Sequence, residues 1–202
     1  MKKCFLAFGI LVGSIFGVSN TDVSAEENNK AEANQLIENF KVKHPDWTFT
    51  EVTADEIAKI KEESAENSTV RASAPPVTAL YIDEVGSQIG TANAYFETIG
   101  SYQLTSHAVK GITGIGVVEM GYGNSWQWLG SEQITYSHPD YDVQSMAIDI
   151  NNDNIVDGYY HAVYFDSDVK ITSGTSELYK FRSISRNYPW NTMETSINIP
   201  HQ

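Results

Sequence analysis

The segment from Val143 to Phe165 reads VQSMAIDINNDNIVDGYYHAVYF, and it decides the fold expected for this chain. Its two outer parts, Val143–Ile150 and Tyr159–Phe165, are rich in residues that favour strands. Between them lie Asn, Asp and Gly residues, which are typical of tight turns. The segment therefore predicts a β-hairpin. Because Tyr159–Phe165 is apolar on both faces, we expect its strand to lie at the centre of a sheet and not at a binding surface.

Short alternating runs with turn residues between them continue through the whole region 77–202. Evenly spaced short strands of this kind favour an antiparallel β-sandwich or Greek-key domain, so we expect a mainly β fold. The stretch Thr91–Lys110 is ambiguous, because its apolar residues also fit a helical spacing. The expected strands are Thr78–Val85, Ile112–Met120, Trp126–Leu129, Gln133–Ser137, Val143–Ile150, Ile155–Phe165, Val169–Thr172, Glu177–Ile184 and Thr195–Ile199.

A charged, helical segment, residues 26–71, precedes this β region, and residues 72–76 read as a linker. Apolar residues from Ala33 to Phe40 recur at spacings of three and four, which predicts an amphipathic helix that ends before Pro45. Trp47–Val52 alternates like a short strand, and Thr53-Ala54-Asp55-Glu56 has the form of a capping box before a second helix. The interpretations that stay open are an N-terminal spacer or a helical appendage that packs on the main domain, and a pro-region cut near Arg71.

Residues 1–25 have the pattern of a secretory signal peptide. Lys2 and Lys3 precede an apolar run that is too short to span a membrane, and small residues lead to an expected cleavage after Ala25. Cys4 is the one cysteine of the chain, so the mature protein would contain no disulfide. We expect a secreted, extracellular protein without a transmembrane segment.

The overall charge narrows the partners that the protein can have. The chain contains 26 acidic and 13 basic residues, a formal net charge of −13. A nucleic-acid-binding protein needs a basic surface to displace the counterions of phosphate, and electrostatic adsorption to an anionic membrane needs the same. Both classes of partner are therefore disfavoured.

The turn of the central hairpin has the spacing of a calcium-binding loop. Oxygen-bearing side chains stand at its relative positions 1, 3, 5 and 9, and position 7 supplies a backbone carbonyl. Three carboxylates in nine residues repel one another unless a cation neutralises them. Position 12 is Tyr160, so the helix–loop–helix form of the site is excluded. The alternative is an Asx-rich turn without metal. The expected calcium ligands are Asp149, Asn151, Asp153, Ile155 and Asp157.

Aromatic residues in a secreted β domain suggest a carbohydrate ligand. Trp126 and Trp128 are two residues apart, so on a strand they face the same side. Exposed rings of this kind stack on sugars, although tryptophans on a strand are also common as half-buried packing residues. The expected ligand-binding residues are Tyr122, Trp126, Trp128 and Trp190.

Sequence motifs for catalysis are absent from the chain. It contains no Gly-x-Ser-x-Gly elbow, no His-Glu-x-x-His and no cysteine in the mature region. His107 and His161 lie in alternating segments and are interpreted as structural. The neighbouring carboxylates Asp83 and Glu84 could serve glycoside hydrolysis only across a cleft.

One known family resembles this chain. The stretch from Ala74 to Ser87, with the later loop Asp149–Tyr160, is similar to the YolA-like family of small secreted bacterial proteins. The resemblance implies a signal peptide and an extracellular domain of uncharacterised function, and it transfers no catalytic residue.

We therefore expect an extracellular module that binds carbohydrate or another cell-envelope ligand and carries a structural calcium loop. The alternatives are a secreted hydrolase, whose site would assemble near His107, His138 and the acidic loops, and a toxin or bacteriocin-like factor.

Overall fold

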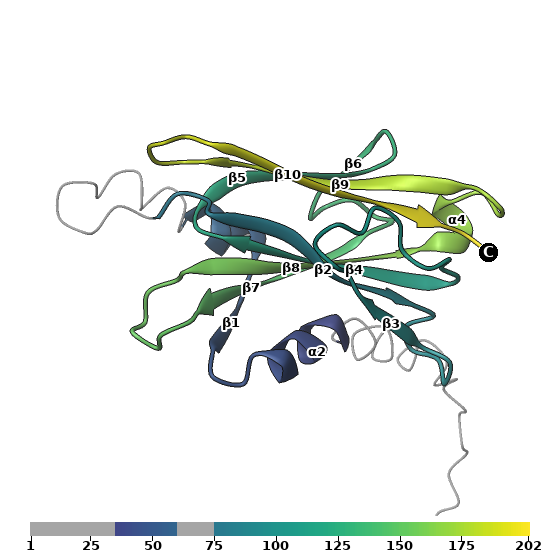
Figure 1. The fold of residues 1–202 in the computed structure, drawn as a ribbon, viewed down its shortest axis with the longest axis horizontal. Helices are drawn as coiled ribbons and strands as arrows, with labels where there is room; N and C mark the ends of the chain where they lie inside the picture. The colour runs from purple at the N-terminus through teal and green to yellow at the C-terminus, as the bar shows by residue number, and fades with distance from the viewer. Residues whose placement is uncertain (1–34, 60–74) are drawn as a thin grey trace, which may run out of the picture.

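A computed structural model describes residues 35–59 and 75–202 of the chain. The expected signal peptide, residues 1–25, lies outside the described residues. The fold is a sandwich of two antiparallel sheets with a helix, α2, packed beneath the larger sheet (Figure 1). The larger sheet has the strand order β1-β7-β8-β4-β2-β3, and the smaller sheet has the order β10-β9-β5-β6. The expected mainly β fold is confirmed.

The larger sheet contains the central hairpin. It comprises β1 (Thr48–Val52), β2 (Ala79–Ser87), β3 (Tyr95–Thr98), β4 (Ile112–Met120), β7 (Asp142–Asp149) and β8 (Gly158–Asp166). The smaller sheet comprises β5 (Gly123–Leu129), β6 (Glu132–Ile134), β9 (Ser176–Ser185) and β10 (Thr192–Pro200). The helices are α2 (Gln35–Lys43) and α4 (Ser167–Lys170), and residues 54–59 are also helical.

Strand β8 lies between β7 and β4, and it is buried on both faces as its sequence predicted. One face of β8, with Val163 and Phe165, contributes to the core between the two sheets. The opposite face, with Tyr160 and Tyr164, packs against α2. A strand covered on both sides explains why this run contains no hydrophilic face.

The segment before the linker is part of the folded domain. Helix α2 buries Leu36, Ile37 and Phe40 against the larger sheet, and strand β1 extends that sheet by pairing with β7. Gly114 of β4 allows the close approach, because a Cβ at this position would lie 2.7 Å from a methyl of Leu36. The segment packs on the main domain as an appendage would, and the expected cut near Arg71 lies outside the described residues.

The ends of the helices follow the expected signals. Helix α2 ends at Lys43, two residues before Pro45. The expected capping box is also present: the Thr53 backbone N–H donates to the Glu56 carboxylate at 2.8 Å, and the Glu56 N–H donates to Thr53 Oγ1 at 3.2 Å.

The structure corrects one expected strand and resolves one ambiguous stretch. The expected strand Val169–Thr172 is wrong, because Ser167–Lys170 forms the short helix α4, which is capped by the Asp166 side chain. The ambiguous stretch Thr91–Lys110 contains strand β3 at Tyr95–Thr98 and no helix. At α4, the carboxylate cap overrides the strand-like alternation, because its local hydrogen bond stabilises a helical turn.

Candidate functional site

The outer face of the smaller sheet presents two tryptophans. Along β5 the side chains alternate, so that Gln127 faces the interior while Trp126 and Trp128 face outward. The Trp126 side chain is 36% exposed, and Trp128 is half-buried. Neither ring belongs to a hydrophobic core cluster of the described residues. The expectation that both rings share one side of a strand is confirmed.

Basic side chains of the neighbouring strand β9 flank both rings. Trp126 is paired in register with Arg182, and Trp128 is paired with Lys180. The Lys180 ammonium lies 4.7 Å from the centre of the Trp128 ring, which is a cation–π contact. Within residues 35–59 and 75–202, neither Lys180 nor Arg182 forms an ion pair with a carboxylate. We call this surface, made by Trp126, Trp128, Lys180 and Arg182, the aromatic face.

The two other expected ligand residues lie elsewhere. Tyr122 is buried, with 6% of its side chain exposed, and it packs edge-on against Tyr159 at 5.8 Å. Burial raises the pKa of the Tyr122 hydroxyl to about 12. Trp190 is 63% exposed and lies in the turn between β9 and β10, where its ring contacts Tyr188. Only Trp126 and Trp128 therefore stand side by side on one strand.

A pocket of about 160 Å³ opens between the two sheets, next to β5 and β6. Trp126 lines this pocket and also belongs to the aromatic face, so the two features adjoin. The remaining apolar lining residues are Ile57, Ile134 and Phe181, and the polar ones are Ser125, Gln127, Gln133, Thr135, Tyr136 and His161.

A buried chain of hydrogen bonds forms the polar end of the pocket. His161 Nε2 lies 3.2 Å from Glu119 Oε2, and His161 Nδ1 lies 2.8 Å from Ser145 Oγ. The Tyr136 hydroxyl lies 2.9 Å from Ser145 Oγ. At the other end, Ser125 Oγ donates to Glu119 Oε2 at 2.6 Å. The two ends of this series of hydrogen bonds are Tyr136 and Ser125, and both residues line the pocket.

This arrangement resembles a Ser–His–Glu triad but lacks an accessible nucleophile at Ser145. Both ring nitrogens of His161 already have partners, and Ser145 is only 4% exposed. A general base must reach the proton that it removes, and a nucleophile must reach its substrate. Sequence reasoning treated His161 as structural and missed its partners, because Glu119 and Ser145 come from separate strands.

The two histidines expected near a hydrolase site lie apart from this pocket. His107 is exposed and pairs with Glu97 at 2.9 Å. His138 Nε2 lies 3.0 Å from Glu132 Oε1. Neither His107 nor His138 contacts the hydrogen-bonded residues around His161, so the structure does not bring these three histidines together.

A second polar cluster surrounds His138. Ligand atoms of Glu132, His138 and Asp140 all lie within 4.8 Å of one another. The Lys170 ammonium lies among these carboxylates, 3.0 Å from Glu132 and 2.7 Å from Asp140. Hydrogen bonds from Tyr141 and then Lys170 lower the pKa of Glu132, and the Lys170 hydrogen bond lowers that of Asp140. A cation of the chain itself thus already neutralises this cluster.

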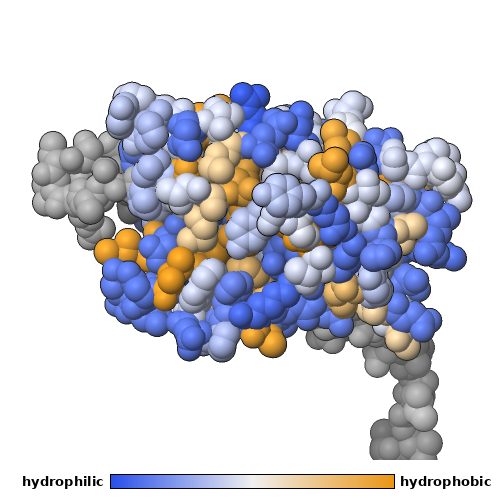
Figure 2. Space-filling view, viewed as in Figure 1, coloured by the Kyte–Doolittle hydropathy of each residue, from blue (hydrophilic) through white to orange (hydrophobic). Residues whose placement is uncertain are grey.

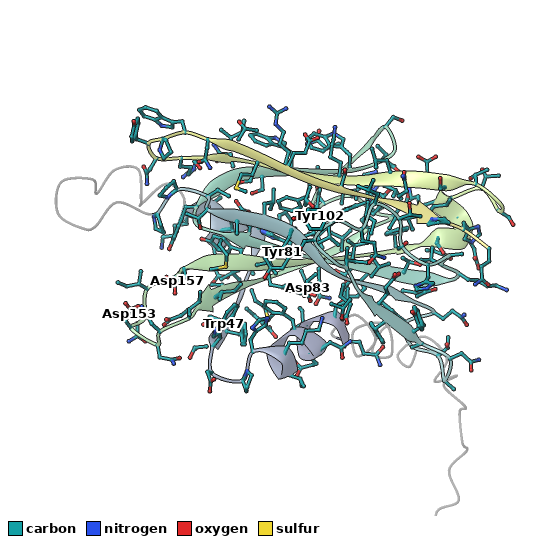
Figure 3. The ribbon with its side chains drawn as sticks, viewed as in Figure 1. Trp47, Tyr81, Asp83, Tyr102, Asp153 and Asp157 are labelled. Atoms are coloured by element: carbon teal, nitrogen blue, oxygen red, sulfur yellow. The ribbon has the colours of Figure 1, made fainter. Side chains whose placement is uncertain are left out.

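Asp83 and Glu84, the adjacent carboxylates of β2, are held by the N-terminal segment. Lys43 of α2 lies 2.9 Å from Asp83 and 3.3 Å from Glu84, and Asn39 donates to Glu84 at 3.1 Å. Figure 3 shows Asp83 between β2 and the helix. Their role in the structure is to bind α2 to the sheet.

The expected calcium loop joins β7 to β8, and Figure 3 shows Asp153 and Asp157 at this end of the sandwich. Its carboxylates accept backbone hydrogen bonds. Asp149 accepts from the N–H groups of Asp153 and Asn154, and Asp157 accepts from Ile150 at 2.8 Å. Among the described residues, the loop carboxylates do not form a group as close as that of Glu132, His138 and Asp140.

The backbone of the loop contains left-handed asparagine residues. Asn154 has a φ of 64°, a left-handed conformation that asparagine tolerates better than most residues. The Asn152 amide donates to the Asp46 carbonyl at 3.2 Å, which ties the loop to the segment before β1.

The fold and the aromatic face define a two-sheet β-sandwich protein with two outward-facing tryptophans on one strand. The family described as "Domain of unknown function (DUF4879)" matches residues 72–199. The chain belongs to this family, and the match begins after the segment that carries α2 and β1. No curated protein and no solved structure matches the chain. In the described part of the chain, no helix has the length and apolar character needed to cross a membrane.

Proposed function

We propose that this protein is an extracellular module that binds carbohydrate of the cell envelope or the surroundings through its aromatic face. The observation that carries the proposal is the outward orientation of Trp126 and Trp128 from one strand, outside the hydrophobic cores. Rings two residues apart on a strand present a continuous apolar surface to the flat faces of sugar rings.

The neighbours of the tryptophans suit a polyhydroxylated ligand. Lys180 and Arg182 can donate hydrogen bonds to hydroxyl oxygens, and the guanidinium of Arg182 is exposed beside Trp126. Ser196 of β10 is paired in register with Lys180, and Glu194 with Arg182, so β10 adds further polar groups to the same face. The view in Figure 2 shows hydrophobic residues in small separate groups among hydrophilic ones. A small aromatic surface with a polar rim is typical of a ligand site.

The extracellular setting and the structural calcium are parts of the same proposal. The pattern of residues 1–25 supports export, and the resemblance to the YolA-like family supports an extracellular domain. The oxygen spacing of the β7–β8 loop supports a structural calcium ion held by Asp149, Asn151, Asp153, Asp157 and the carbonyl of Ile155. Its affinity would be in the extracellular range, a Kd of about 10⁻⁴–10⁻³ M.

Binding to insoluble polysaccharides tests the proposal. The purified chain is incubated with purified bacterial cell wall, cellulose and chitin, and the bound fraction is measured. We expect binding to at least one, and a loss of about tenfold in affinity, ~1.4 kcal/mol, for Trp126→Ala with Trp128→Ala. Trp190→Ala is the control, because it removes an equally large exposed ring outside the aromatic face.

Unfolding of the double variant would imitate a loss of binding. Circular dichroism and thermal unfolding are therefore measured on the same samples. Wild-type binding that the double variant retains with full affinity would contradict the role of the aromatic face.

A further inference from the structure

The pocket beside the aromatic face has a composition of its own. Its lining combines apolar groups, such as Phe181 and Ile134, with polar groups that converge from β5, β8 and the segment after β6. Thr135 and Gln133 lie exposed at its rim, whereas His161 at its interior end is 3% exposed. A concave site with apolar walls and a few fixed polar groups is the usual form of a small-ligand site.

The polar end of this pocket is held in one arrangement. The hydroxyl of Tyr136 is fixed by Ser145, Ser145 by His161, and His161 by Glu119. Glu119 is completely buried and also accepts hydrogen bonds from Ser125 and Ser183. Hydroxyls with fixed partners need little reorganisation when a ligand binds, which favours affinity.

The volume of the pocket limits what it can take. At about 160 Å³ it is smaller than the roughly 300–1,000 Å³ of pockets that hold drug-sized ligands. It offers room for one ring of monosaccharide size and excludes an oligosaccharide. Hydroxyl and amide groups in the lining suit a neutral polyhydroxylated ring, and no lysine or arginine is among its lining residues to pair with an anionic one.

The position of the pocket connects it to the aromatic face. Ser125 and Gln127 face the pocket from the same strand that presents Trp126 and Trp128 outward. If the terminal ring of a glycan entered the pocket, the next rings of that glycan would lie beside Trp126 of β5. The lining also includes Ile57 of the N-terminal segment, which is 5% exposed.

We infer that this pocket is a terminal subsite for a single neutral hexose or N-acetylhexosamine ring, so that the protein recognises the end of a glycan chain. The inference rests on the proposed function and deepens it. An aromatic face alone would bind the flat sides of internal rings, whereas a pocket of one ring's size accepts only a chain end.

Ligand-observed NMR with free monosaccharides tests the inference. Glucose, galactose, mannose, N-acetylglucosamine and N-acetylgalactosamine are titrated into the full chain, and saturation transfer and Kd are measured. Thr135→Trp fills the rim of the pocket with a large side chain. Ser137→Trp is the matched control, because Ser137 is exposed two residues away and does not line the pocket.

The expected result is binding of at least one monosaccharide to the wild type, weakened tenfold or more in Thr135→Trp. Affinity for that monosaccharide should be unchanged in Ser137→Trp. If the wild type binds a polysaccharide but no monosaccharide, or if Thr135→Trp binds as tightly as the wild type, the terminal subsite is refuted and the aromatic face remains. If neither monosaccharide nor polysaccharide binds, both proposals fall together.

Discussion

His161 Nε2 of β8 lies 3.2 Å from the Glu119 carboxylate of the neighbouring strand β4, and both side chains are buried between the two sheets. Serines of the opposite sheet, Ser125 and Ser183, donate to the same carboxylate. Burial of a carboxylate is costly unless it is fully hydrogen-bonded. The polar chain therefore fixes how the two sheets face each other, in addition to forming one end of the pocket.

Removal of His161 should destabilise the sandwich strongly. In His161→Leu, the Glu119 carboxylate keeps its serine donors but loses its imidazole partner, at a cost of about 3 kcal/mol. Urea unfolding followed by tryptophan fluorescence measures the change. Val163→Ala, a truncation on the same face of the same strand, reports the cost of lost apolar packing alone. A His161→Leu variant as stable as the wild type would show that the carboxylate does not depend on this contact.

Truncation of Phe40 should show that the N-terminal segment belongs to the folded domain. Phe40 of α2 is fully buried and stacks on Tyr160 of β8, with the ring centres 4.2 Å apart. Phe40→Ala should reduce the free energy of unfolding by about 3–5 kcal/mol. Val42→Ala, on the exposed side of the same helix with 80% of its side chain accessible, should change it by less than about 0.5 kcal/mol. A segment that functions only as a detachable pro-region would leave the unfolding of the β domain unaffected by Phe40→Ala.

The contribution of Lys170 should depend on pH. The hydrogen bond from Tyr141 and then the contact with Lys170 lower the pKa of Glu132, and the contact with Lys170 lowers the pKa of Asp140. The stabilisation by Lys170 is therefore complete above the ordinary pKa values of the two carboxyls and is lost as the pH falls through the lowered ones. Lys170→Met should therefore lower Tm at pH 7, and the difference from the wild type should shrink as the pH falls toward 3. Thermal unfolding between pH 7 and pH 3 measures it. A constant difference across that range would assign the effect to packing of the lysine stem.

The sequence predicted those parts of the fold that depend on neighbours in the chain. Ile112–Met120 was expected as a strand and is strand β4 with the same bounds, because its alternation and its flanking glycines are local signals. The capping box at Thr53 is local in the same sense. Helix α4 was missed although its cap by Asp166 is local, because Ser167 is also held by hydrogen bonds to the carbonyl of Gly111, which is far away in the sequence.

Of the candidate site, only the part formed by a single strand, β5, could be predicted from the sequence. The shared side of Trp126 and Trp128 follows from the two-residue period of a strand. The pocket and the hydrogen bonds of His161 join residues from six strands, from the N-terminal segment and from the segment after β6. No spacing in the sequence indicates that Ser125 lies within reach of Glu119. Burial of Tyr122 likewise depends on Ile57, which comes from the N-terminal segment and packs in the same cluster.

Calcium should stabilise the protein through the β7–β8 loop. Asp149, Asp153 and Asp157 place three carboxylates within nine residues of one exposed loop, and a divalent ion would relieve their mutual repulsion. In millimolar calcium we expect Tm to rise relative to chelating buffer, with saturation near the Kd of about 10⁻⁴–10⁻³ M given by titration calorimetry.

Asp153→Asn should abolish the calcium-dependent shift and raise Tm in chelating buffer, because it removes one of the repelling charges. Asp142→Asn, at the other end of β7, removes the same charge outside the loop and should leave the shift intact. If Tm is equal with calcium and with chelator, the loop is an Asx-rich turn whose carboxylates serve the backbone N–H groups of Asp153, Asn154 and Ile150.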